Sequence, residues 1–416
     1  MKKKTLLFIL PALFATVSCN AGSKFYSKDI PEYGHFFDVE PYEVKGTKNI
    51  GESSYFKFHG RHYFDNSLQA EFLSFSNSGF EVTFVGTTLE GYFFTTKADD
   101  IEKRPYLSVT IDNDYNPDHS FPISLTADKY SNSQRREGAY FVHEHVVLAH
   151  GLEYGKHTIR VYKKSECLMS KVAIKSLSCD GEFVTVEPKE MKMKMEFYGD
   201  SVTCGYAVES PDFYENFSTR TENSLMSYAN YAANELSADV SLISCGGYPM
   251  YKSRYSEGCN PSTIPEMVSL ADVEYQTNNK HIWDNASYVP DVVVIALGAN
   301  DGSVLSGLSN ESSQKQFLKN YKSTYISFIE KLFTLYPKTL IVISDEILWI
   351  DPRFVSAMDE IASSLSNEGK NVIRAKYEAY DLAKDKNLPG NGHPNKEMQK
   401  IAGHELSETI RAKIGE

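Results

Sequence analysis

The sequence predicts two domains of different fold class, an N-terminal all-β jelly-roll sandwich and a C-terminal three-layer α/β domain with a parallel sheet. Three observations support this prediction. The chain has 416 residues, which is more than a single hydrophobic core usually supports. Its first half shows no helical periodicity, whereas its second half alternates short apolar runs with helical stretches. We expect the sandwich at residues 40–188 and the α/β domain at residues 190–416.

The predicted sandwich consists of short strands separated by turns. Large apolar residues alternate with mostly polar ones in residues 80–85, and turn-forming sequences such as Asn77-Ser78-Gly79 and Asp180-Gly181 lie between strands. Many short strands with frequent turns are typical of a jelly roll. The further β-rich runs are residues 106–112, 139–148 and 157–162.

The pattern changes after Pro188. Short apolar runs rich in β-branched residues are typical of strands that are buried on both faces. Strands that alternate with helices indicate a parallel sheet covered on both sides. The apolar runs are residues 195–198, 240–243, 292–297 and 340–343, and the helical stretches are residues 224–236, 316–335, 354–365 and 396–410.

The composition of the chain argues against some classes of partner. The formal net charge is −12, and no long basic block occurs outside the extreme N-terminus and the short run at residues 189–194. Nucleic acid and anionic membrane surfaces are therefore not expected as partners, and neutral substrates fit better. We expect the protein to work as a monomer without a metal or a cofactor.

The N-terminus resembles an export signal. Residues 1–18 combine a basic start with an apolar core that is too short to span a membrane. Small residues precede Cys19, as in the lipobox of bacterial lipoproteins, where the cysteine is lipidated. We expect a lipoprotein of the outer membrane or cell surface that touches the membrane only through this anchor, with a periplasmic or secreted protein as the alternative.

The remaining five cysteines match no zinc-binding spacing. Because their number is odd, at least one thiol of an exported chain stays unpaired. We expect them to act as small buried hydrophobes rather than as disulfides or reactive thiols. They are Cys167, Cys179, Cys204, Cys245 and Cys259.

Polar residues follow the first three predicted strands of the α/β domain. Ser201 follows the first strand, Gly246 and Gly247 follow the second, and Asn300 follows the third. Because ligands of open α/β sheets bind beyond the carboxyl ends of the strands, we expect these residues to meet at one edge. Ser201 is the candidate nucleophile, and the alternative is that it only caps a helix.

An attacking serine needs donors for the negative charge that develops on the substrate oxygen. The backbone N–H groups of Ser201 and Gly246 and the side-chain amide of Asn300 are the candidate oxyanion donors, with Gly247 as the competitor of Gly246. A plain turn role is the alternative for each of the glycines and for Asn300.

His393 is the candidate general base because Gly392-His393-Pro394 breaks the chain just before the last predicted helix. In many serine hydrolases of this layout an Asp stands three residues before the His, but here that position is Gly390. Either a backbone carbonyl orients the imidazole, giving a Ser-His dyad, or Asp381 or Asp385 folds back. The pair His143 and His145 would share one strand face but lacks a third metal ligand.

Ser201, Gly246, Asn300 and His393 together resemble the four motif blocks of the SGNH (GDSL-type) hydrolase superfamily. The β-rich N-terminal half and the sequence from Gly199 to Tyr206 at the nucleophile are similar to carbohydrate esterase family 2. The second block departs from that family, since Ser-Cys-Gly-Gly replaces its usual Ser-Gly-x-Gly.

This resemblance implies a cofactor-free deacetylation of acetylated plant cell-wall polysaccharides or oligosaccharides, often at the sugar 6-hydroxyl. It also implies that a Ser-His dyad is tolerated and that an aromatic side chain supports the sugar, for which Trp349 is the candidate. The alternatives are an esterase that acts on another acylated glycan, peptidoglycan or lipid, and a non-catalytic glycan-binding surface lipoprotein.

Overall fold

The computed structural model describes residues 26–27, 35–36, 41–112, 114–127, 135–187, 191–212, 214–273, 281–348, 350–378 and 389–415. The predicted signal segment, Cys19, Trp349, Asp381 and Asp385 lie outside these residues. Within the described part, no helix is long and apolar enough to cross a membrane.

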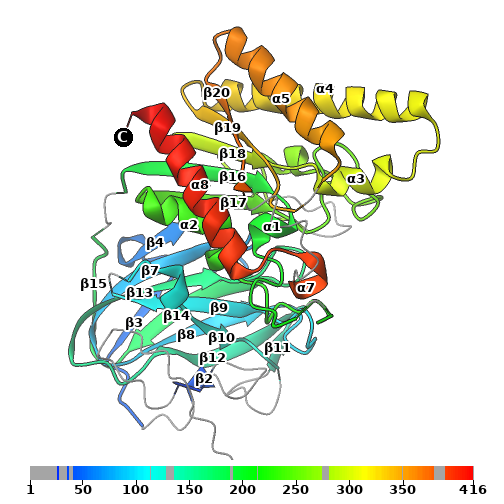
Figure 1. Cartoon of the computed structure of the whole chain (residues 1–416). Coiled ribbons are helices and arrows are strands. Elements are labelled where there is room, and N and C mark those ends of the chain that lie inside the picture. The colour runs from blue at the N-terminus through cyan, green and yellow to red at the C-terminus, as the bar shows by residue number, and fades with distance from the viewer. Residues whose placement is uncertain are drawn as a thin grey trace, which may run out of the picture.

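The N-terminal half forms two antiparallel sheets that face each other (Figure 1). Its strands are β3 (Gly46–Asn49), β4 (Phe56–His59), β5 (His62–Asp65), β6 (Ala70–Leu73), β7 (Gly79–Gly86), β8 (Leu89–Thr95), β9 (Tyr106–Ile111), β10 (Phe121–Ser124), β11 (Arg135–Glu137), β12 (Tyr140–Ala149), β13 (Gly155–Lys163), β14 (Val172–Cys179) and β15 (Glu182–Val184). One sheet has the order β10-β9-β13-β7-β15 with β4 also on β7, and the other has the order β11-β12-β8-β14-β6-β5 with β3 also on β14. Outside both sheets, β1 (Tyr26–Ser27) pairs with β2 (His35–Phe36).

The two sheets share one apolar core, to which β7 contributes Phe80, Val82 and Phe84. The alternation that predicted this strand is therefore confirmed. The polar face of β7 is also buried, beneath the α/β domain. There Nε of Arg160 on β13 donates to Oε2 of Glu81 at 2.5 Å. The predicted sandwich is thus present, and one of its faces is a domain interface.

The C-terminal half is built on a parallel sheet of order β17-β16-β18-β19-β20. Its strands are β16 (Met193–Gly199), β17 (Ala238–Ser244), β18 (Val292–Ala296), β19 (Leu340–Ser344) and β20 (Val372–Ala375). Its helices are α1 (Ser201–Cys204), α2 (Tyr228–Glu235), α3 (Ala299–Leu305), α4 (Glu311–Leu335), α5 (Pro352–Asn367), α7 (Pro389–Gly392) and α8 (Lys396–Ile414). Short 3₁₀ turns are η1 (Ser53–Tyr55), η2 (Pro117–His119), η3 (Ser224–Met226) and η4 (Ile264–Met267).

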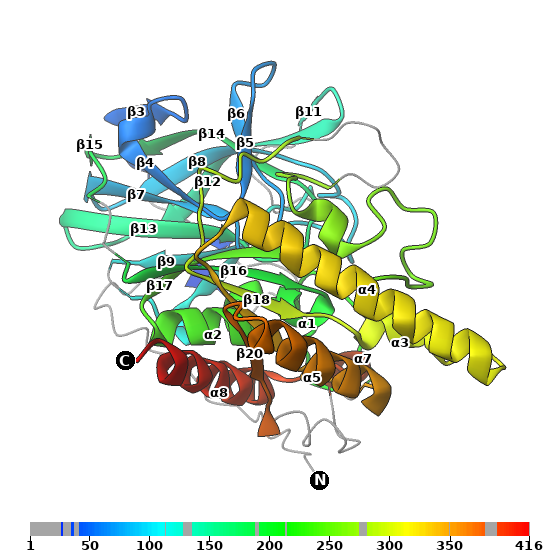
Figure 2. The same cartoon turned by 90° about the horizontal axis from the view of Figure 1, so that it is seen from above.

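Neighbouring residues of a central strand point into different cores. Phe197 of β16 packs in the core under α2 and α8, whereas Tyr198 packs in the core under α4 and α5. Figure 2 shows α2 and α8 side by side when the molecule is seen from above. The α/β domain therefore has the three layers that the sequence predicts.

The predicted helix at residues 224–236 is the main error among the elements. The chain forms η3, then turns extended at Ser227, and only then starts α2. The edge strand β20 was not predicted, since it has only four residues and two of them are half-buried. Between the domains, β15 ends at Val184 and β16 begins at Met193.

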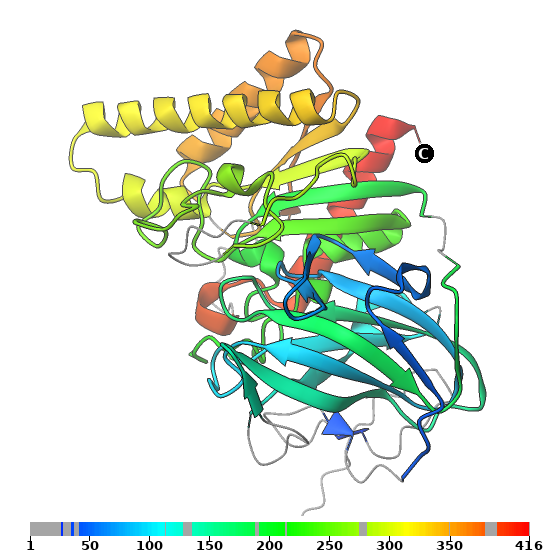
Figure 3. The ribbon, with the colours of Figure 1, turned by 180° about the vertical axis from the view of Figure 1, so that it is seen from behind.

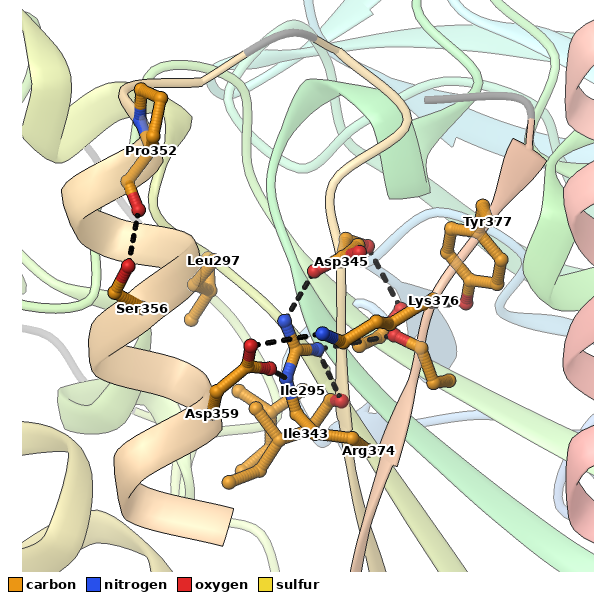
Figure 4. Close-up of polar contacts among 12 residues, drawn as sticks. Ile295, Leu297, Ile343, Asp345, Pro352, Ser356, Asp359, Arg374, Lys376 and Tyr377 are labelled. Atoms are coloured by element: carbon orange, nitrogen blue, oxygen red, sulfur yellow. Dashed lines mark hydrogen bonds and ion pairs between the residues drawn. The ribbon is translucent and has the colours of Figure 1, made fainter. Parts of the chain in front are cut away.

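Arg374 holds this edge strand in place (Figure 4). Its Nη1 donates to the carbonyl of Ile343 on β19 at 2.8 Å, and its Nε donates to Asp359 of α5 at 2.9 Å. Its Nη2 pairs with Asp345, which lies just after β19. One side chain therefore connects β20, β19 and α5.

The other edge strand, β17, lies against the sandwich (Figures 1 and 3). Close to it, Arg61 leaves the turn between β4 and β5 and enters the α/β domain, where it is fully buried. Its Nη1 donates to the carbonyls of Met267 and Leu270 at 3.0 and 2.9 Å, and its Nη2 donates to Glu196 at 3.1 Å. Glu196 lies on β16, the strand that leads to Ser201. We call Arg61 and Glu196 the Arg61 anchor.

Candidate active site

Ser201 is the first residue of α1, directly beyond the carboxyl end of β16. The helix is capped by Asp200, whose side chain accepts the N–H of Val202 at 3.0 Å. The capping role that was the alternative for Ser201 thus belongs to its neighbour. The turn is so tight that a Cβ on Gly199 would lie 1.9 Å from Oγ1 of Thr203, which explains the glycine.

The hydroxyl of Ser201 meets the imidazole of His393, with 2.9 Å between Oγ and Nε2. Nδ1 of His393 lies 3.1 Å from the carbonyl oxygen of Gly390. Because a carbonyl can only accept, Nδ1 must carry the proton, and the lone pair of Nε2 then faces the hydroxyl. This is the tautomer that a general base requires.

Gly390 therefore provides the backbone carbonyl that the sequence suggested as one of two ways to orient His393. It has a φ of +51°, and a Cβ there would lie 2.1 Å from the Cβ of Ala207, so the loop needs glycine at this point. Tyr206 lies against the imidazole with ring centroids 4.1 Å apart, and Phe217 stacks on the tyrosine. Rings and carbonyl together restrict the rotation of His393.

The turn of residues 245–248, which we call the catalytic turn, differs from the prediction. The N–H of Gly246 donates to Oε2 of Glu166 at 2.5 Å, so this donor is already occupied. Within the described part of the chain, the N–H of Gly247 has no acceptor. The role of Gly246 as an oxyanion donor stays a prediction; its N–H is bonded to a side chain of the sandwich, and this geometry favours its competitor Gly247.

Asn300 lies in the first turn of α3 and faces the helix that carries Ser201. Its Nδ2 donates to Asp200 at 2.7 Å and to the carbonyl oxygen of Tyr248 at 3.3 Å. Asn300 thus connects the loops that follow β16, β17 and β18. The bond to Tyr248 is the longer and weaker of the two.

Two buried carboxyls support the site, and the sequence analysis did not assign a role to either. Burial raises the pKa of Asp200 to about 7 and that of Asp301 to about 7. Asp301 accepts the backbone N–H groups of Met250, Tyr251 and Lys252 at 2.9, 2.8 and 3.1 Å, which fixes the chain just after the catalytic turn. The sequence offered one indication of this role, since Asp200 directly precedes Ser201 and Asp301 directly follows Asn300.

The exposed aromatic residue Tyr255 was also not predicted from the sequence. The side chain of Tyr255 is close to the catalytic turn, since a Cβ on Gly247 would lie 2.8 Å from its Cβ. Tyr255 is 72% exposed, which is unusual for a large aromatic residue. Trp349, the predicted sugar platform, lies outside the described residues, so that assignment stays a prediction.

The two histidines of β12 do not share a face. A bulge follows His143, and His145 has a φ of +56°. His143 is buried with its Nε2 2.8 Å from the hydroxyl of Thr95, whereas the exposed His145 pairs with Glu90. The described residues contain no group of three or more His, Cys, Asp or Glu side chains that could hold a metal ion.

A serine hydroxyl paired with an imidazole at the carboxyl edge of a parallel sheet is the arrangement of a serine hydrolase. The family comparison agrees with this class. The chain belongs to the GDSL-like lipase/acylhydrolase family, whose model matches residues 195–406.

The individual proteins that the chain is similar to are also named as esterases. The chain is 31% identical over 189 residues to "Cellulase/esterase CelE" of Acetivibrio thermocellus, covering 43% of this chain and 20% of that protein. It is 26% identical over 271 residues to "Acetylxylan esterase / glucomannan deacetylase" of Cellvibrio japonicus, covering 64% of this chain and 70% of that protein. The chain therefore spans only a fifth of the length of CelE.

The fold matches a solved structure across both domains. A family two carbohydrate esterase from Clostridium thermocellum, solved in complex with cellohexaose, aligns with a TM-score of 0.68 at 21% identity. The alignment covers 86% of this chain and 99% of that chain. The predicted two-domain architecture of sandwich and α/β hydrolase domain is thereby confirmed.

Proposed function

We propose that this protein is a serine carbohydrate esterase that removes O-acetyl groups from plant cell-wall polysaccharides of the xylan or glucomannan type, at the 6-hydroxyl where the sugar is a hexose, as in glucomannan. The observation that carries the proposal is the 2.9 Å contact between Oγ of Ser201 and Nε2 of His393. The substrate class is supported by the names of the relatives, acetylxylan esterase and glucomannan deacetylase, and by the architecture of family two carbohydrate esterases.

In the proposed mechanism, Nε2 of His393 takes the proton of the Ser201 hydroxyl as its oxygen attacks the acetyl carbonyl. The N–H groups of Ser201 and Gly247 and the amide of Asn300 bind the oxyanion. The N–H of Ser201 is free for this role because the first N–H of a helix has no acceptor within the helix.

The same imidazole then protonates the sugar oxygen as the C–O bond breaks, which leaves an acetyl group on Ser201. Water, deprotonated by His393, attacks this ester and releases acetate. Throughout both steps the carbonyl of Gly390 accepts a hydrogen bond from the N–H at Nδ1 and so helps to hold the imidazole.

We propose that the exposed ring of Tyr255 stacks on a sugar residue next to the acetyl group, because a ring of this kind beside the catalytic turn offers an apolar face to a pyranose. Export and lipidation of Cys19 stay part of the proposal, as does a monomeric state. Labelling cells with a fatty-acid probe, with Cys19→Ala as the control, tests the anchor.

The decisive experiment is acetate release from acetylated glucomannan and acetylated xylan, followed by position-resolved NMR of the remaining acetyl groups. With the native protein we expect loss of 6-O-acetyl signals from glucomannan and of ring O-acetyl signals from xylan, and no loss from either polymer with Ser201→Ala. Hydrolysis of p-nitrophenyl acetate without release of acetate from either polymer would assign the Ser-His site to another acyl substrate. No hydrolysis of any ester would favour a glycan-binding protein.

A further inference from the structure

A loop of the sandwich reaches the catalytic turn. Between β13 and β14, Glu166 leaves the sandwich with only 1% of its surface exposed. Its Oε2 accepts the N–H of Gly246 at 2.5 Å. Its Oε1 lies so close that a Cβ on Gly246 would be 2.8 Å from it. The carboxylate therefore packs directly on the backbone of the turn.

This loop is braced on both sides of Glu166. Nζ of the buried Lys163 donates to the carbonyls of Ser165 and Glu166 at 2.6 and 2.9 Å. The thiol of Cys167 lies 3.8 Å from the sulfur of Cys245, the first residue of the catalytic turn. The loop thus holds a fixed position relative to the turn that it contacts.

Among the described residues, hydrogen bonds hold the two ends of the catalytic turn, at Cys245 and Tyr248, but not its central peptide. The N–H of Tyr248 donates to the carbonyl of Cys245 at 3.2 Å, and Gly247 has a φ of +81°. These features match a type II turn, in which the central peptide is rotated by about 180° relative to a type I turn. That central peptide carries the N–H of Gly247.

Two adjacent glycines make both orientations of the central peptide accessible, because neither residue has a Cβ that would favour one of them. Only one orientation presents the N–H of Gly247 to the substrate oxygen. The N–H of Gly246 belongs to the preceding peptide, between Cys245 and Gly246. Its bond to Glu166 therefore fixes the position of the peptide from which the central peptide continues.

We propose that Glu166 is a positioning residue of the oxyanion hole, which holds the catalytic turn through the N–H of Gly246 so that the N–H of Gly247 faces the substrate. This inference rests on the proposed function of Ser201 as a nucleophile. It also gives the sandwich a direct part in the reaction, in addition to its packing against the α/β domain.

The surroundings of Glu166 show which substitutions test this role. Burial raises the pKa of Glu166, and the N–H of Gly246 and the charge of Lys163 act in the opposite direction. Glu222 is fully buried in the same cluster, and burial raises its pKa strongly. Glu222 also interacts with the backbone N–H of Glu166, so it is not independent of the residue under test. Asp272 is a buried carboxyl that bonds to Ser74 and Lys171, so Asp272→Asn is a matched control for a change of buried charge.

The first test compares Glu166→Ala and Glu166→Gln with the native protein in the hydrolysis of p-nitrophenyl acetate, normalised to active sites by titration. For Glu166→Ala we expect kcat and kcat/KM to fall together by up to about 10²-fold, the lower end of the loss of one oxyanion donor. The amide oxygen of Gln still accepts the N–H of Gly246, so Glu166→Gln should keep kcat within about tenfold of native. Asp272→Asn should leave kcat per active site unchanged.

A double-mutant cycle supplies the second test. Gly246→Ala introduces a Cβ against Glu166, and this clash is absent when Glu166 is Ala. We expect the effects of Glu166→Ala and Gly246→Ala on kcat/KM to be non-additive. Additive effects, or a Glu166→Ala variant with native kcat per active site, would overturn the inference. If the native protein and Ser201→Ala are equally inactive, the proposed function fails instead.

Discussion

Two of the contacts that the sandwich makes with the α/β domain act on different targets. At the Arg61 anchor a buried guanidinium pairs with Glu196 in the middle of β16. At the second point, Glu166 accepts a single N–H of the catalytic turn. A strand is already fixed by its neighbours in the sheet, whereas a Gly-Gly turn is not. We therefore expect the first contact to determine stability and the second to determine rate.

The largest effect on the rate of hydrolysis should come from Ser201 and His393. Replacing Ser201 by Ala removes the nucleophile, and we expect hydrolysis of p-nitrophenyl acetate to fall by at least about 10⁴-fold, as in other serine hydrolases. His393→Ala should have a similar effect because it removes the base. The check is a steady-state assay with thermal unfolding as the folding control, and native rates in either variant would contradict the assignment.

The Arg61 anchor should behave in the opposite way. Arg61→Met leaves Glu196 as a buried charge without its partner, and breaking a buried pair in this manner costs about 3–5 kcal/mol of unfolding free energy. Chemical denaturation measures this loss, while kcat per active site should stay native.

A matched double variant sharpens the test of the anchor. The double variant Arg61→Met with Glu196→Gln removes both charges. The Gln oxygen can still accept the hydrogen bond that the hydroxyl of Tyr198 donates to Glu196. We expect it to recover most of the stability, since an uncharged pair needs no compensation. A native-like stability of Arg61→Met alone would show that the anchor is not a structural contact of this kind.

Asp200, between the strand and the oxyanion donors, should give the protein a pH-dependent stability. Burial raises its pKa to about 7, whereas an Asp of the unfolded chain has a pKa near 4. Between these two pKa values the folded state holds a proton that the unfolded state releases. The contribution of Asp200 to stability is therefore greatest below about pH 4 and is lost as the pH rises through about 7.

Asp200→Asn cannot titrate and provides the reference for this effect. The difference in melting temperature between the native protein and the variant should shift against the native protein from pH 5 to pH 7.5. A constant difference over this range would mean that the carboxyl has no raised pKa in the folded protein.

The smallest effect is expected at the rim of the site. Tyr255→Ala should raise KM for acetylated glucomannan by about two- to tenfold, which corresponds to a stacking contribution of about 0.5–1.5 kcal/mol. Hydrolysis of p-nitrophenyl acetate should change much less, because this substrate carries no sugar. Equal effects on both substrates would place Tyr255 in the support of the catalytic turn rather than in sugar binding.

Most of the fold could be predicted because its pattern is local. Buried parallel strands such as residues 292–296 are continuous apolar runs, and an alternating strand such as β7 shows its two faces in the sequence. The helix at residues 224–236 was misplaced because Ser227 interrupts it without a Gly or Pro signal. The short edge strand β20 depends on bonds from its own Arg374 to Asp359 and Ile343. These partners lie on other elements and are not visible in the local pattern.

In the candidate site, too, the residues in local motifs could be predicted and the long-range contacts could not. Ser201 and His393 follow from motifs and from the rule that ligands bind at the carboxyl ends of parallel strands. The occupied N–H of Gly246 could not be predicted, because its acceptor Glu166 is 80 residues away in another domain. A backbone carbonyl was one of two open alternatives, but which carbonyl could not be predicted; the 3.1 Å distance from the oxygen of Gly390 to Nδ1 of His393 identifies it.

The most direct test of the Ser201–His393 pair is the site of covalent labelling by a p-nitrophenyl phosphonate, located by mass spectrometry of the peptides. A phosphonate forms a stable adduct only with a nucleophile that a neighbouring base activates. We predict a single adduct on Ser201 in the native protein and a greatly slowed reaction in His393→Ala. An adduct on another residue, or equal labelling rates with and without His393, would contradict the account.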